Sequence, residues 1–110
     1  MSRRLVRTLL DTSSSGAHTL FTVPTDHKYE LLGVFVQPSV AGPKEYDVTV
    51  SPSEGGTLLI DWFVSDAVTR YGKRFEYTSL PILAGETLNC SNASANSLRV
   101  FAWYVDVDFS

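Results

Sequence analysis

The sequence predicts an all-β fold, a single antiparallel β-sandwich or jelly roll of about eight strands. The composition favours strands, because two Trp, five Tyr and six Phe are interspersed with Val, Ile and Thr, which suit a pleated, half-buried surface. Turn signals recur at short, fairly even spacing, and several segments between them alternate apolar and polar residues. A length of 110 residues with 44% hydrophobic content supplies one modest core, so residues 1–110 are expected to form one domain.

The first three strands are expected at residues 4–10, 18–23 and 29–37. The first ends at the polar turn formed by residues 11–16, and Pro24 stops the second because proline cannot donate a ladder hydrogen bond. Pro38 and the loop at residues 41–43 close the third strand.

The fourth and fifth strands, residues 45–51 and 57–64, are predicted to form a hairpin. The fourth alternates most cleanly, with Tyr46, Val48 and Val50 on one face and polar residues on the other. The intervening segment ends in Gly55-Gly56, and glycine reaches the positive φ angles that tight hairpin turns require. Residues 65–72 are interpreted as a loop, since the segment is too short to change the class.

The last three strands are expected at residues 74–79, 87–90 and 98–109. Phe75 and Tyr77 should point inward from the sixth strand, while Pro81 and Gly85 bound the bend that follows it. After a polar loop at residues 91–96, the chain ends in its longest strand.

Three strands carry apolar residues on both faces, whereas a two-layer sandwich needs only one apolar face per strand. They are residues 31–36, 58–64 and 98–109. A contiguous exposed apolar surface usually marks a contact site, so we predict a subunit interface. Its candidate residues are Arg3, Arg4, Arg7, Leu98, Val100, Ala102 and Tyr104. The alternative is that loops and the strand at residues 4–10 fold over the second faces.

No catalytic, metal-binding or cofactor-binding residues are predicted. His18 and His27 are the only histidines that could serve as a base, neither lies in a motif, and both are interpreted as surface residues. The chain has too few Cys and His for a common zinc site. Carboxylates at positions 61, 66, 106 and 108 could gather a calcium ion, but their spacing matches no calcium loop. The protein is therefore expected not to be an enzyme.

Charge and hydropathy set the expected partners and location. A net charge of −3 gives no general attraction to nucleic acid or to an anionic membrane. The start of the chain lacks the pattern of a signal peptide, and no stretch approaches the roughly 20 apolar residues that span a bilayer. With Cys90 alone, no intrachain disulfide can form. We expect synthesis in the cytoplasm, no membrane and no nucleic-acid partner.

Two stretches carry a resemblance to a known group of proteins. The segment Leu80-Pro81-Ile82-Leu83-Ala84-Gly85-Glu86-Thr87-Leu88 resembles the Ala-Gly-Glu-x-Leu turn of small tailed-phage virion β-sandwiches. Val23-Pro24 to Tyr29-Glu30-Leu31-Leu32 resembles the opening that often accompanies it. Together they cover about a third of the chain. In this pattern the glycine takes the tight bend and the leucine re-enters the core.

The resemblance implies a non-enzymatic structural protein of a bacteriophage particle, made in the host cytoplasm and located in the virion. It would be a capsid decoration or cement protein, or a head or tail accessory subunit, that bridges neighbouring subunits. Its partners would be capsid or other virion proteins and further copies of itself, with a trimer preferred. The alternative is a carbohydrate-binding β-sandwich in which Tyr71 stacks on a sugar, with Trp62 and Trp103 assigned to the core.

Overall fold

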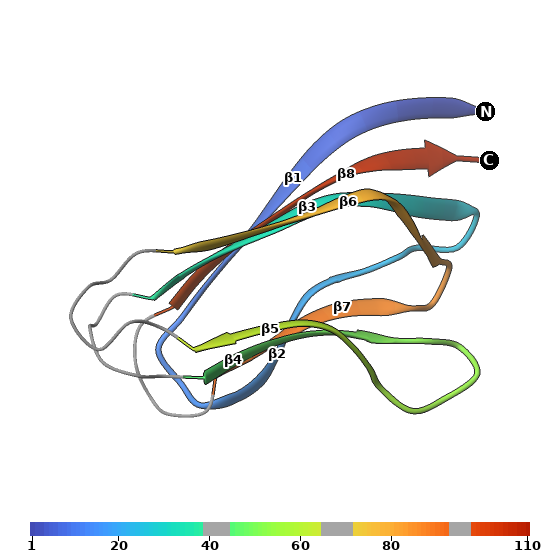
Figure 1. Cartoon of the computed structure of the whole chain (residues 1–110). Helices are drawn as coiled ribbons and strands as arrows, with labels where there is room; N and C mark the ends of the chain where they lie inside the picture. Colours follow the sequence, from blue (N-terminus) through green and yellow to red (C-terminus); the bar gives the residue numbers. More distant parts are fainter. Residues whose placement is uncertain (39–44, 65–71, 93–97) are drawn as a thin grey trace.

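Eight strands form two four-stranded sheets in a computed structural model that describes residues 1–38, 45–64, 72–92 and 98–110 (Figure 1). The strands are β1 (Ser2–Thr12), β2 (Gly16–Thr22), β3 (His27–Pro38), β4 (Glu45–Ser51), β5 (Leu58–Val64), β6 (Lys73–Leu83), β7 (Thr87–Asn92) and β8 (Leu98–Asp108). The predicted class, an all-β sandwich of about eight strands, is confirmed.

The strand order is β1-β8-β3-β6 in one sheet and β2-β7-β4-β5 in the other, and every neighbouring pair is antiparallel. Successive strands mostly alternate between the sheets, which is the jelly-roll arrangement. The sheets lie as two layers, with both ends of the chain in the β1-β8 half of one layer (Figure 1). The edge strands are β1 and β6 in the first sheet and β2 and β5 in the second.

The core lies between the sheets, where the inward faces of the strands meet. Tyr46, Val48 and Val50 are all buried, as the alternation of β4 predicts. Leu31, Val34 and Val36 of β3 pack there, together with Leu88 and Cys90 of β7. Burial, with the nearby charge of Asp47, raises the pKa of the Cys90 thiol to about 12, so this cysteine stays protonated and unreactive at neutral pH.

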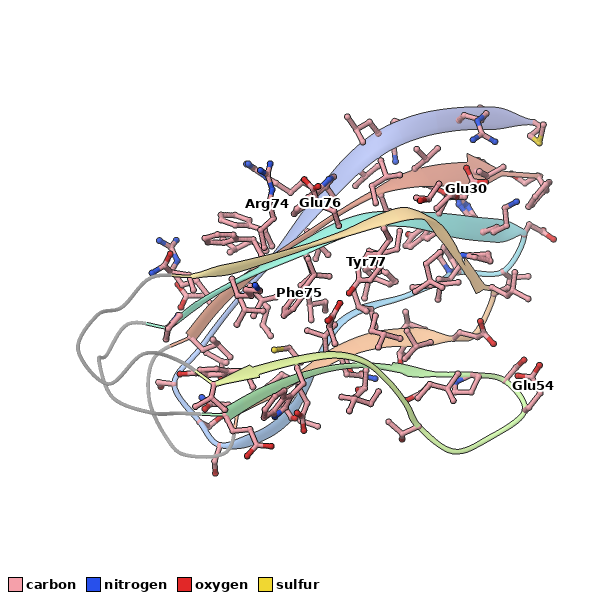
Figure 2. The ribbon with its side chains drawn as sticks, viewed as in Figure 1. Glu30, Glu54, Arg74, Phe75, Glu76 and Tyr77 are labelled. Carbon is pink, nitrogen blue, oxygen red and sulfur yellow. The ribbon has the colours of Figure 1, made fainter. Side chains whose placement is uncertain are left out.

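β6 shows how one strand serves both surfaces of its sheet. Arg74 and Glu76 point away from the second layer, whereas Phe75 and Tyr77 point toward it (Figure 2). Phe75 is buried, and the half-buried Tyr77 hydroxyl donates a 2.9 Å hydrogen bond to Asp61 of β5 in the facing sheet. Burial raises the pKa of Tyr77, so its hydroxyl stays protonated and donates a hydrogen bond to the Asp61 carboxylate at the sheet edge.

The predicted boundaries of β6 were too short at its C-terminal end, where a bend was expected at Pro81. The strand continues to Leu83, and Pro81 lies opposite Glu30 of β3. Proline is tolerated there because β6 is an edge strand, so the N–H that proline lacks would have had no partner on the open side.

Gly55, Gly56 and Gly85 have the positive φ values expected of their turns, between 81° and 99°. A residue that the sequence interpretation passed over, Glu86, joins two of these turns. Its carboxylate accepts hydrogen bonds of 2.8 Å from the backbone N–H groups of Leu83 and Ser53, and its side chain is buried. These bonds lower the pKa of Glu86.

β1 extends the sheet in its own plane instead of covering it. It pairs with β8 along its whole length, from Ser2 opposite Asp108 to Thr12 opposite Leu98. The alternative in which this strand folds over a second apolar face is therefore wrong. In the described part of the chain, no helix has the length and apolarity needed to cross a membrane.

Candidate functional site

The outer face of the β1-β8-β3-β6 sheet carries large aromatic and apolar side chains that lie outside the core. Alternation along β8 sends Phe101 and Trp103 outward, and β1 adds Leu5 and Leu9, which are 70% and 46% exposed. Cross-strand register aligns Phe35 of β3 and Leu9 of β1 with Phe101. The apolar residues of three strands therefore meet on one exposed face.

The four β8 residues predicted to form the interface lie on the other face of the strand. Leu98, Val100 and Ala102 are fully buried and Tyr104 is 3% exposed, all within the core cluster. That part of the interface prediction is wrong. Both faces of β8 are apolar, so alternation identified two faces without deciding which one meets the second sheet.

Glycines let the outward aromatic rings lie flat against the sheet. A Cβ on Gly33 would come within 2.1 Å of the Trp103 ring, and one on Gly72 within 2.4 Å of the Phe35 ring. Neither position leaves room for a side chain, so the rings cover bare backbone. This packing holds Trp103 and Phe35 in place on the surface.

Two arginines complete a groove on this face, which we call the aromatic groove: Arg7, Phe35, Arg74, Phe101 and Trp103, enclosing about 440 Å³. The guanidinium carbon of Arg7 lies 5.0 Å from the centre of the Phe101 ring. That of Arg74 lies 5.9 Å from the Trp103 ring. Both distances fit cation–π contacts, so the groove combines an aromatic floor with positive charge.

Alternation along β1 places Arg3 and Arg7 on one face and Arg4 on the other, so the three arginines predicted to act together do not form one cluster. Arg3 forms an ion pair with Glu30, and Arg4 lies 3.6 Å from Asp106. Only Arg7 lines the aromatic groove.

A second polar site lies where β3 begins and β8 ends. His27 Nδ1 is 2.6 Å from Asp106 Oδ1, and His27 Nε2 is 3.7 Å from Asp108 Oδ1. The hydrogen bond to Asp106 raises the pKa of His27, which favours the imidazolium. With Arg4 also at Asp106, these charges satisfy one another and tie three strands together. Together they form an ion-pair network at this end of the sheet.

The carboxylates considered for calcium do not gather in the structure. Asp61 lies in the other sheet from Asp106 and Asp108, bonded to Tyr77, and Asp66 lies outside the described residues. Within residues 1–38, 45–64, 72–92 and 98–110, no group of three His, Cys, Asp or Glu side chains could hold a metal ion.

β5 exposes a further apolar row that the sequence interpretation assigned in part to the core. Trp62 is 51% exposed, and its Nε1 donates a 2.9 Å hydrogen bond to Glu45. Leu59 and Val64 are also exposed. Trp103 is outward as well, so the assignment of both tryptophans to the core is wrong. Tyr71, the candidate for glycan stacking, lies outside the described residues.

Comparison with known proteins finds likeness in structure alone. No protein-family model matches, and no curated protein matches the sequence. The core of Drosophila NLP, described with pentamer formation and histone binding, has 12% identity and a TM-score of 0.57, covering 98% of this chain and 100% of that one. A chain of Bacillus endospore appendages, described as disulfide-linked pili, has 12% identity and a TM-score of 0.55, covering 99% and 90%.

A structure from infectious bursal disease virus is also similar. A chain of its VP2 subviral particle has 12% identity and a TM-score of 0.52, covering 96% of this chain and 33% of that one. At such identities the likeness establishes the fold. The jelly-roll β-sandwich is therefore shared with a viral capsid protein and with proteins of other kinds.

Proposed function

We propose that this chain is a non-enzymatic structural subunit of a virus particle, of the capsid decoration, cement or head/tail accessory type. It bridges neighbouring subunits through the outer face of the β1-β8-β3-β6 sheet. The observation that carries the proposal is the exposed apolar surface there, with Leu5 at 70% and Leu9 at 46% exposure beside the aromatic groove. Such a surface is costly to leave in water and marks a contact site.

A stable contact would take up only a modest share of the surface of this chain. A standard interface buries about 800 Å² on each partner, which is roughly an eighth of the 6026 Å² that this chain exposes. The fold shared with a capsid protein supports a place in the virion, with other virion proteins and further copies as partners. Virion genes cluster, so head or tail structural genes beside the coding sequence would support this part, and unrelated metabolic genes would count against it.

Leu9→Glu is expected to weaken self-association about tenfold or more, because the change removes apolar contact area and places a charge in the interface. Light scattering after size-exclusion chromatography, over a range of concentrations, measures the effect. Leu83→Glu is the matched control: Leu83 is 49% exposed against 46% for Leu9, but lies at the end of β6. Leu83 is on the same outer face but at the end of the opposite edge strand, beside Lys28 and outside the aromatic groove, so this variant should associate like wild type. A wild-type chain that stays monomeric up to about 1 mM would contradict self-association.

The flat rings of Trp103 and Phe35 favour one other function, carbohydrate binding, because sugars stack on exposed aromatic faces. The arginines over Phe101 and Trp103 count against it, since a neutral sugar offers no opposite charge to their guanidinium groups. Binding on a glycan array that is lost in Trp103→Ala would support this second candidate instead.

A further inference from the structure

The two sheets present outer surfaces of opposite charge. The aromatic groove on the first sheet carries the guanidinium groups of Arg7 and Arg74. On the second sheet, Glu45 and Asp47 point outward from β4, because their neighbours Tyr46 and Val48 are buried. Neither β4 nor β5 contains a lysine or an arginine.

The carboxylates on β4 lie beside the exposed apolar row of β5. Asp47 is paired in register with Trp62, and Glu45 with Val64. Leu59, opposite Thr49, extends the row. We call this surface the acidic corner: Glu45, Asp47, Leu59, Trp62 and Val64. It presents an indole with two carboxylates, and one of these accepts the indole hydrogen bond.

The charges of the aromatic groove are available to a partner. Among the described residues, no carboxylate lies within 4.0 Å of Arg7, whose guanidinium group packs over the Phe101 ring. Arg74 is 3.3 Å from Glu76, but both side chains are about two-thirds exposed. An ion pair this exposed is worth little and is readily exchanged.

We propose that the aromatic groove of one copy receives the acidic corner of a second copy, with Trp62 against the aromatic floor and Glu45 and Asp47 near Arg7 and Arg74. This rests on the proposed function, which requires association, and it specifies how the copies meet. The groove, at about 440 Å³, is larger than one indole. Charge-assisted bonds between arginine and carboxylate fix such a contact in register.

The alternative of two grooves facing each other is disfavoured. A two-fold contact would bring Arg7 and Arg74 of both copies together, and like charges across an interface are repulsive. Groove-to-corner contact instead joins two different surfaces of the same chain. Such head-to-tail interfaces close into a ring or continue as a filament, so assembly should not stop at a two-fold dimer.

Charge reversal tests the pairing. The groove variant is Arg7→Glu with Arg74→Glu, and the corner variant is Glu45→Arg with Asp47→Arg. Each alone should weaken association about a hundredfold or more in sedimentation velocity at 0.15 M salt, because like charges then face each other. The chain with all four changes, and a 1:1 mixture of the two double variants, should recover to within about tenfold of wild type. Lys28→Glu with Arg99→Glu, the same charge change outside the groove, should leave association within about threefold.

Rescue is the decisive result, because loss of folding cannot be repaired by mixing two variants. If wild type associates but the corner variant is unimpaired, or the fourfold variant stays dissociated, the groove-to-corner pairing is overturned while the proposed function stands. A wild type that does not associate at all overturns the proposed function together with this pairing.

Discussion

Val100→Asp should unfold the protein. Val100 is fully buried in β8 and packs in the core between the sheets. A carboxylate there would lose its hydration. The aspartate side chain would also lose the apolar contacts that valine makes with the core. Mutations that bury an unpaired charge are among those that lower the free energy of unfolding by more than about 4–5 kcal/mol. The whole free energy of unfolding of a domain is only about 5–15 kcal/mol.

Urea unfolding followed by circular dichroism measures this effect. Leu9→Asp is the control, since it places the same carboxylate on the outer face, where Leu9 is 46% exposed. It should change the free energy of unfolding by less than about 1 kcal/mol. A folded Val100→Asp chain that fails only to associate would show that the inner face of β8 is an interface.

Glu86→Ala is expected to be the second most damaging change. It removes the acceptor of two short backbone hydrogen bonds, from Leu83 and Ser53, that join the β6–β7 turn to the β4–β5 turn. A hydrogen bond to a charged acceptor contributes about 1.5–3 kcal/mol, and water can reach the freed N–H groups because both bonds are only part-buried, so the total loss should be about 2–4 kcal/mol by urea unfolding. Glu54→Ala, an exposed carboxylate in the β4–β5 turn, is the matched control and should be nearly neutral (Figure 2).

The effect of Glu86 should depend on pH in a fixed direction. The folded state lowers the pKa of this carboxyl, because the ionised form accepts the two backbone bonds. Its stabilisation is therefore fully present above the unfolded pKa and is lost as the pH falls through the folded pKa. The difference in unfolding free energy between wild type and Glu86→Ala should shrink on acidification below pH 4.5, the ordinary pKa of a glutamate side chain. If the difference stayed constant through that range, the ionised form of Glu86 would not be what stabilises the fold.

The strands were predictable because their signals are local. Pro24, Pro38 and the Gly55-Gly56 turn punctuate the chain, and the alternation of β4 fixed which of its residues are buried. β6 was cut short at Pro81 because the rule that proline ends a strand does not apply at an edge, and no local signal shows which strands are edges.

The sequence predicted that an exposed apolar surface exists, but not which residues form it. Apolar residues on both faces of β8 indicated an exposed surface, but the residues chosen for it, Leu98 to Tyr104 on one face, are the core. Gly33 opposite Trp103 was the signal that went unused, since a glycine beside a large ring in neighbouring strands indicates a ring lying flat on backbone. That signal needs the register of β3 and β8, which the sequence does not state.

By itself, the sequence determined the all-β class, the eight strands and the turns that separate them, because period-two alternation and turn chemistry act between near neighbours. Only the tertiary structure decided the strand order, the buried face of β8 and the meeting of Arg7, Arg74 and Trp103 in one groove. These depend on pairing between residues far apart in the chain, from β1 to β8, and the free energy that selects the pairing comes from burying the core as a whole.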